Sequence, residues 1–237
     1  MKPMAILAAS SNDTRMMKYS RTYMKGIIVS LAVAVSALQL VQAQGTFLSN
    51  LGQPSAGSVV VGSDSWLAAI FHTGTNAGGY MLDSIQLAMA DASGSPSGFT
   101  VMVYAPDAGS YFPGHSLGTL NGSLNPVTSG IYTYTPATNL TLAPRGDYSI
   151  VLTAGTPVAN GAYGSSYVGI NSYNPSDGWF CRGLWTSSNG GPLWTGSAGA
   201  FPQFAINATI IPEPSVLSLF VLGGFLLVWH GRKAPVG

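Results

Sequence analysis

Residues 148–152 read Tyr-Ser-Ile-Val-Leu, and residues 204–207 read Phe-Ala-Ile-Asn. In both stretches large apolar side chains alternate with smaller or more polar ones, and this period of two is typical of a β-strand with one buried face. Short apolar runs of this kind recur through residues 44–211 at spacings of roughly 8 to 15 residues, separated by Gly, Pro, Asn, Asp and Ser. The pattern predicts an all-β domain.

We expect strands over ten segments of this region. They are residues 57–61, 66–72, 80–89, 100–104, 130–135, 139–142, 147–153, 163–170, 179–185 and 203–210. Segments rich in Gly, Pro, Ser or Asn predict turns or loops at residues 92–98, 143–147 and 189–192. The fold class that this order predicts is an antiparallel β-sandwich, jelly-roll-like, with one core.

Charged residues are scarce along the whole chain. They make up 7% of the 237 residues, whereas about 25% is usual for soluble domains, and 46% of the chain is apolar. This composition disfavours an ordinary cytoplasmic enzyme. Residues 44–211 contain six aspartates and two arginines, a formal charge of −4, which excludes a nucleic-acid partner bound through phosphate contacts.

Residues 1–43 have the three-part pattern of a secretory signal peptide. Five basic residues lie within the first 25 positions, and residues 26–40 form the apolar run GIIVSLAVAVSALQL. Val41-Gln42-Ala43 then supplies a small-residue site, so we expect an N-terminal signal helix that signal peptidase cleaves between Ala43 and Gln44. Met16, Met17 and Met24 stay open as alternative starts.

Residues 212–237 have a second three-part order. Pro212-Glu213-Pro214 is followed by the apolar run VLSLFVLGGFLLVW at residues 216–229, and Arg232 and Lys233 come next. As a helix, this run spans about 21 Å, less than the ~30 Å hydrocarbon core of a bilayer. We therefore expect a single short transmembrane helix that holds the protein in the membrane transiently, with its basic flank in the cytoplasm.

This order of motif, short apolar helix and basic cluster resembles the PEP-CTERM sorting signal of Gram-negative bacteria that make exopolysaccharide. The resemblance implies a second partner, an exosortase, which is a membrane-embedded transpeptidase with a Cys nucleophile. Pro212, Glu213 and Pro214 would carry recognition, and the enzyme would release or transfer the protein to the cell surface or extracellular matrix. A lasting membrane anchor is the alternative that stays open.

The region between the two processed ends also resembles a known family. The similarity is carried by residues 66–73 (WLAAIFHT), 80–85 (YMLDSI) and 140–148 (LTLAPRGDY), with the short motifs at 103–104 and 113–114. These residues are similar to the choice-of-anchor R domain, a family of extracellular bacterial domains joined to one of several surface anchors, PEP-CTERM among them. The resemblance covers most of residues 58–210 and implies an extracellular domain without an assigned activity.

Residues suited to catalysis are few in the 44–211 region. Nearly all of the six aspartates stand beside Gly, Ser or Pro, where Asp commonly caps turns. The two histidines, His72 and His115, are not accompanied by a G-x-S-x-G nucleophile elbow. We therefore name no catalytic residue and expect no enzyme. We expect neither a cofactor nor a metal, although Ca²⁺ stays open because loop carboxylates and carbonyls suffice to bind it.

Aromatic residues are dense between positions 162 and 195. Trp179, Trp185 and Trp194 lie there among tyrosines and asparagines, and such rings can stack on sugar faces while amides bond hydroxyl groups. The three tryptophans are therefore candidate glycan-binding residues. The competing interpretation, which we favour, is that they belong to the core, where large aromatic side chains add most to stability.

The face on which each of these residues lies decides between the two interpretations. Alternation along residues 179–185 predicts that Trp179, Cys181, Gly183 and Trp185 share one face, with Cys181 buried.

Two functions follow from the sequence. The first is a structural or adhesive protein of the extracellular polysaccharide matrix of a biofilm. The alternative is a carbohydrate-binding module for exported polysaccharide.

Overall fold

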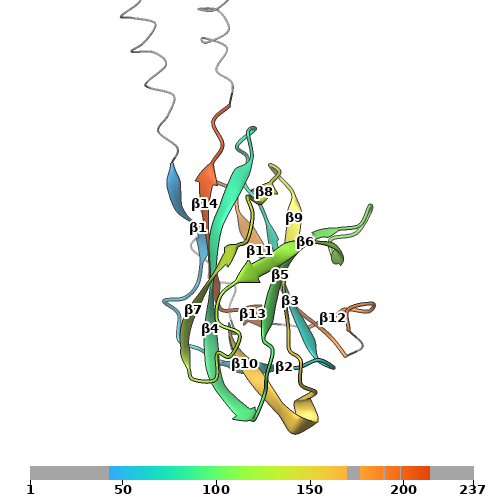
Figure 1. Ribbon diagram of the computed structural model, residues 1–237. Coiled ribbons are helices and arrows are strands. Elements are labelled where there is room, and N and C mark those ends of the chain that lie inside the picture. Colours follow the sequence, from blue (N-terminus) through green and yellow to red (C-terminus); the bar gives the residue numbers. More distant parts are fainter. Residues whose placement is uncertain (1–42, 170–176, 189, 198, 214–237) are drawn as a thin grey trace, which may run out of the picture. The chain divides into compact units, whose positions relative to one another are not determined.

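The computed structural model describes residues 43–169, 177–188, 190–197 and 199–213 (Figure 1). The predicted signal peptide up to residue 42, and the segment from Pro214 that includes the predicted apolar helix at 216–229, lie outside the described residues. Within the described ranges, the secondary structure is almost entirely β, and no helix there is long and apolar enough to cross a membrane.

Fourteen strands and one short 3-10 helix, η2 (Val158–Asn160), make up the described fold. In chain order the strands are β1 (Gln44–Ser49), β2 (Gly57–Val61), β3 (Trp66–His72), β4 (Tyr80–Gly94), β5 (Thr100–Pro106), β6 (Pro113–Asn121), β7 (Gly130–Pro136), β8 (Thr141–Leu142), β9 (Asp147–Thr153), β10 (Gly161–Val168), β11 (Phe180–Ser187), β12 (Thr195–Gly196), β13 (Phe201–Pro202) and β14 (Phe204–Ile210).

All the strand pairs are antiparallel, and together they form one curled sheet. Its main path runs β1-β14-β4-β7-β6-β5-β9-β3-β11-β12, while β10 pairs with β4, β2 and β13, and β8 pairs with β4. We call β1, β14, β4, β7, β8, β10, β2 and β13 the first half, and β6, β5, β9, β3, β11 and β12 the second half. The pairing of β6 with β7 joins them.

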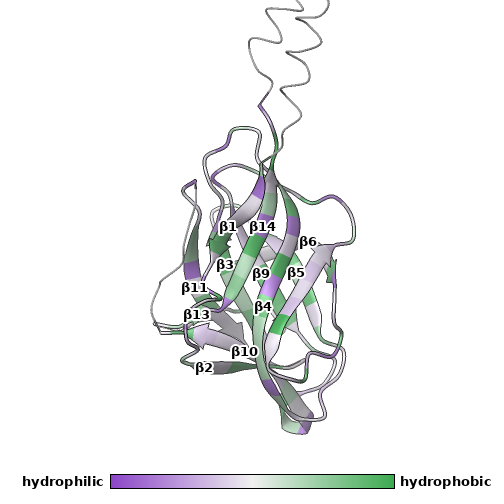
Figure 2. Cartoon of the chain, turned by 90° about the vertical axis from the view of Figure 1, so that its left-hand side faces the viewer, coloured by the Kyte–Doolittle hydropathy of each residue, from purple (hydrophilic) through white to green (hydrophobic). Residues whose placement is uncertain are grey.

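The curl brings apolar side chains of both halves into one core. Tyr80, Ile85 and Phe204 of the first half and Phe71 and Ile150 of the second half are fully buried in the same cluster. Figure 2 shows hydrophobic bands on strands of both halves, among them β14, β4 and β9. The antiparallel all-β class predicted from the sequence is confirmed.

Three predicted strands, at residues 57–61, 66–72 and 147–153, agree with β2, β3 and β9 in both bounds. β1, β6, β12 and β13 were not predicted. β6 illustrates why such strands are missed. Most of its side chains are small, polar and exposed, so its sequence has no alternation of apolar residues. Backbone pairing with β5 defines this strand instead.

Two sequence-based expectations about these strands are wrong. The segment 92–98 is not entirely loop, because β4 extends to Gly94 and pairs there with Gly161 of β10. β9 does not have a single buried face, because Ser149 and Val151 are buried as completely as Ile150 between them. The outer face of the second half therefore has a cover of its own.

Candidate functional site

Strand β11 contains a β-bulge at Arg182. Cys181 pairs with Phe71 of β3, and Gly183 pairs with the adjacent Ile70, so Arg182 is an extra residue in the ladder. Gly183 has a φ of 127°, a backbone conformation that glycine adopts without steric cost. One inserted residue reverses which later side chains face inward.

The bulge separates residues that the sequence places together. Cys181 and Leu184 both belong to the buried core, with 3% and 1% of their surface exposed. Trp185 is half-buried and lies on the opposite face. The prediction that Trp179, Cys181, Gly183 and Trp185 share one face is therefore wrong for Gly183 and Trp185, because sequence alternation does not reveal the extra residue.

Trp179 precedes the bulge and is part of the core, with 1% of its surface exposed. Its ring stacks on Phe71, with 5.9 Å between centroids and 6° between planes. It also meets Tyr80 edge to face at 4.9 Å. Because no ligand can reach a ring buried in this way, Trp179 is not part of the surface site described below.

Trp185 and Trp194 instead lie in a strip of aromatic side chains on the outer face of the second half, where neither is fully buried. We call this strip the aromatic band. Its members are Trp66, His72, Tyr111, Phe112, Phe180, Arg182, Trp185 and Trp194.

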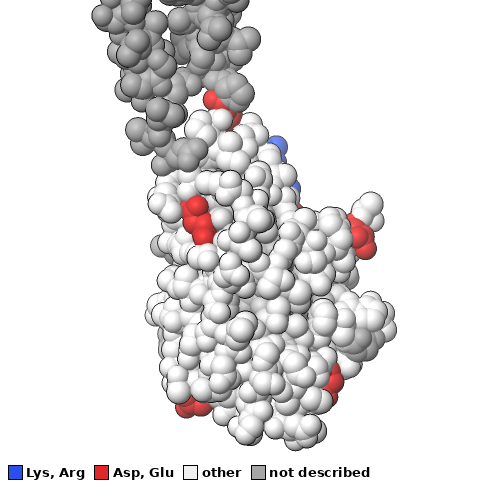
Figure 3. All heavy atoms as spheres, viewed as in Figure 1, with Lys and Arg blue, Asp and Glu red and all other residues white. Residues whose placement is uncertain are grey.

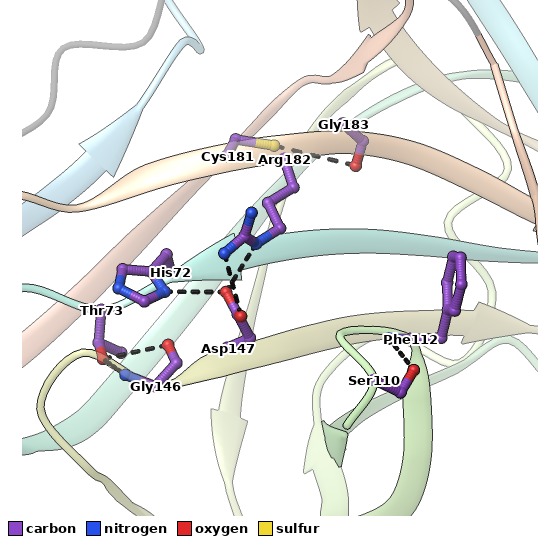
Figure 4. A network of polar contacts seen from close by, with 9 residues as sticks. All are labelled: His72, Thr73, Ser110, Phe112, Gly146, Asp147, Cys181, Arg182 and Gly183. Carbon is purple, nitrogen blue, oxygen red and sulfur yellow. Dashed lines mark hydrogen bonds and ion pairs between the residues drawn. The ribbon is translucent and has the colours of Figure 1, made fainter. Parts of the chain in front are cut away.

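The centre of the aromatic band is formed where the β5–β6 connection meets β11. Phe112 packs edge to face on Trp185 with 4.8 Å between centroids, and Tyr111 lies 5.9 Å from the same ring. The Ser110 hydroxyl accepts a hydrogen bond from the Phe112 N–H at 3.0 Å, which orders the connection (Figure 4). Trp185 is in register with Ala68, whose β9 partner is Val151, so these three residues lie on the same outer face of the sheet.

A charged group forms one end of the aromatic band. Arg182 donates two hydrogen bonds to Asp147, from Nε at 2.8 Å and from Nη2 at 3.1 Å, and His72 Nδ1 lies 2.8 Å from the same carboxylate (Figure 4). Burial raises the pKa of Asp147, but the hydrogen bonds from Arg182 and His72 outweigh burial and lower that pKa below its ordinary value. Asp147 is therefore held as a carboxylate.

Arg182 also lies against two exposed rings. Its guanidinium carbon is 5.1 Å from the centre of Phe180 and 5.6 Å from the centre of Tyr111, which are cation–π distances. Phe180 stacks in turn on the His72 ring at 4.7 Å. Phe180 is 40% and Tyr111 is 38% exposed, so both rings at this end of the aromatic band are partly open to solvent beside hydrogen-bonding groups.

Two tryptophans form the other end. An added Cβ at Gly191 would lie 3.3 Å from the ring of Trp66 and 3.9 Å from the ring of Trp194, so both indoles lie next to this glycine. The indole N–H of Trp66 donates to the carbonyl of Ser63 at 3.1 Å. These contacts fix Trp66 at the start of β3, on the same outer face as His72 at its end.

The predicted sorting motif begins one residue after the end of β14, with Ile211 between them. The turn at residues 76–79 holds this end of the strand: Asn76 Nδ2 donates to the carbonyl of Ile211 at 3.0 Å, and the Ile211 N–H donates to the carbonyl of Gly79 at 3.0 Å. The N–H of Ala77 donates to the carboxylate of Glu213 at 3.0 Å. Pro212 lies between these contacts, and Pro214 is outside the described residues.

The predicted cleavage residues lie beside the same strand. The carbonyl of Ala43 accepts a hydrogen bond from the N–H of Ile210 at 3.0 Å, and Gln44 begins β1. Gln44 Nε2 donates to Asp83 at 3.0 Å, and Thr209 donates to the same carboxylate oxygen at 2.8 Å. The two ends of the described fold therefore meet across the β1–β14 ladder.

Other charged residues in the described ranges are dispersed. Figure 3 shows acidic side chains widely separated on a mostly uncharged face. No group of three or more His, Cys, Asp or Glu side chains suited to a metal ion occurs among the residues that the structure describes. His115 lies on β6, 3.7 Å from Asp107.

Comparison with known proteins adds no family assignment. No protein-family model matches this chain, and no curated protein has a similar sequence. The resemblances noted from the sequence therefore rest on the residues that carry them.

Sequence reasoning identified two members of the aromatic band and missed the rest. Trp185 and Trp194 were candidates because of the aromatic density around them. Tyr111 and Phe112 lie in a distant connection, and their signal is an adjacent pair of large aromatic residues between Ser110 and Pro113, where a polar turn is usual.

Proposed function

We propose that this chain is an exported, non-enzymatic protein of the cell surface or extracellular polysaccharide matrix of a Gram-negative bacterium. An exosortase sorts it through Pro212, Glu213 and Pro214 after signal peptidase has cut before Gln44. The role of the β domain is structural or adhesive. The observation that carries the proposal is the order of motif, apolar run and basic cluster over residues 212–237.

Three further features support export and surface exposure. The low charge and the high Gly and Ser content suit a domain outside the cytoplasm, and residues 26–43 have the order of a signal-peptide core and cleavage site. A single cysteine, buried as Cys181, leaves no exposed thiol among the described residues.

We assign the curled sheet to the jelly-roll-like sandwiches, because two halves enclose one core.

The sorting proposal is tested by fractionation of a Gram-negative host with and without its exosortase. We expect the processed protein, which ends near Pro214, in the surface or medium fraction only when the exosortase is present. We expect Glu213→Ala to be retained in the membrane. Glu213→Gln separates the effect of the carboxylate charge from that of the hydrogen bond to Ala77, because the amide oxygen of Gln still accepts that bond. Asp107→Ala, at a side chain that is 75% exposed, is the matched control and behaves as wild type.

Sorting that is unchanged in the strain without exosortase, or in Glu213→Ala, would contradict the proposal.

A second function, carbohydrate binding, is favoured by one specific observation. Half-exposed rings of the aromatic band stand beside Arg182, Asp147 and His72, which combines stacking surfaces with hydrogen-bonding groups as saccharide sites do.

A further inference from the structure

We propose that the aromatic band binds a neutral, linear, β-linked polysaccharide, with pyranose rings stacked along the outer face of β3 and β11. This inference rests on the carbohydrate-binding function proposed above and gives that function a ligand class and a location. Three properties of the band lead to it, namely exposure, length and charge.

Exposure shows which rings are able to stack on a ligand. Tyr111 and Phe180 are 38% and 40% exposed, although aromatic rings of this size are usually buried. Both are held in place by Arg182, which contacts their faces and is itself fixed by two hydrogen bonds to Asp147. A ring that is ordered before binding loses little conformational entropy when a ligand stacks on it.

The length of the aromatic band favours a polymer over a single sugar. Trp66 and His72 are six residues apart on β3 and mark its two ends, which corresponds to about 20 Å at the rise of a β-strand. Between them Trp185 pairs with Ala68 and Phe180 pairs with His72, so these rings are spread along the direction of β3. A flat ribbon of several linked pyranoses, with equatorial hydroxyls and exposed C–H faces, matches such a strip.

Charge distinguishes a neutral polymer from an acidic one. The positive charge of Arg182 is matched by Asp147, which accepts both of its hydrogen bonds. Residues 44–211 carry a net charge of −4, which disfavours the approach of a polyanion. The polar groups at this end of the band are therefore suited to hydroxyl groups and not to carboxylates.

The test measures binding of the full chain, in mild detergent, to cellohexaose by calorimetry, and to insoluble cellulose by co-sedimentation. We expect wild type to bind both probes and the double variant Tyr111→Ala/Phe180→Ala to bind about tenfold more weakly or worse. The matched control is Leu124→Ala/Ile131→Ala. These side chains are 69% and 58% exposed and lie outside the aromatic band, so we expect wild-type affinity.

Each other outcome overturns a defined part of the proposal. Binding of alginate, an acidic polymer, in place of cellohexaose would refute the ligand class and leave carbohydrate binding standing. Cellohexaose binding that survives the double variant would refute the location. Failure of wild type to bind cellohexaose, cellulose or alginate would refute carbohydrate binding itself. The sorting proposal is unaffected by any of these results.

Discussion

Cys181 and Leu184 stand three positions apart in strand β11, and both side chains are buried in the same core. In a regular strand, an odd separation places two side chains on opposite faces. The bulge at Arg182 removes this conflict, and it turns Arg182 and Trp185 outward onto the aromatic band. The outer surface of the domain thus depends on one inserted residue.

The bulge requires glycine at position 183. Gly183→Ala forces a residue with a Cβ into a φ of 127°, although no atom lies within 4 Å of the added methyl group. We expect the free energy of unfolding to fall by about 1–3 kcal/mol, from backbone strain alone. Gly52→Ala is the matched control, because its site is equally open and has no positive φ. Equal stability of the two variants in urea unfolding would contradict this account of the bulge.

Asp147 gives the domain a pH-dependent contribution to stability. Its folded-state pKa lies below the ordinary value of 3.8, so ionised Asp147 stabilises the fold at neutral pH, and this stabilisation is lost as the pH falls through the folded-state pKa. We expect Asp147→Asn to lower the free energy of unfolding by about 1–3 kcal/mol at neutral pH. The difference in the free energy of unfolding between Asp147→Asn and wild type should become smaller in acid, because Asp147 of wild type is then protonated and neither protein carries this negative charge.

The control for this pH dependence is Asp107→Asn. Asp107 also faces a histidine, but at 3.7 Å and with 75% of its side chain exposed, so we expect an effect within about 0.5 kcal/mol. Urea unfolding of wild type and both variants at neutral pH and in acid supplies the comparison. A deficit of Asp147→Asn that stays constant as the pH falls would show that the carboxylate charge is not its cause.

Tyr80 joins the core to the turn that holds Ile211. Its hydroxyl donates to Asp177 and accepts from the N–H of Asn76 at 3.1 Å. Tyr80→Phe leaves both partners without this contact, and we expect a loss of about 1–3 kcal/mol. Tyr104→Phe is the control, because its hydroxyl makes only a 3.9 Å contact to a methionine sulfur. Matching midpoints for the two variants in thermal unfolding would rule out this role for Tyr80.

The two tryptophans of residues 179–185 should differ in their contribution to stability. Trp179→Ala removes a ring that is 1% exposed and stacked on Phe71, so we expect a loss of about 3–5 kcal/mol. Trp185→Ala removes a half-buried ring from the outer face and should cost clearly less. If urea unfolding gave equal losses, the assignment of these rings to opposite faces would be wrong.

The sequence predicts those strands whose side chains carry a strong apolar pattern. Residues 66–72 and 147–153 are recognisable because most of their side chains are apolar and flanked by turn residues. β6 escapes prediction because its residues are held mainly by backbone pairing with β5, which leaves no hydrophobic signature.

The candidate site is less predictable than the fold, because it depends on register. His72 meets Asp147 only because β3 and β9 pair at those two positions. Trp185 faces outward only because of the extra residue in β11. Local composition indicates that aromatic residues gather here, but the bulge and the path of the β5–β6 connection decide which of them meet.

The central claim, export followed by exosortase sorting, is tested most directly by the intact mass of the protein recovered from the envelope and medium of its native host. We predict a wild-type species that begins at Gln44 and ends near Pro214, and we predict that Glu213→Ala abolishes it. A wild-type species that still carries residues 216–237 would contradict the claim and would identify that segment as a lasting anchor.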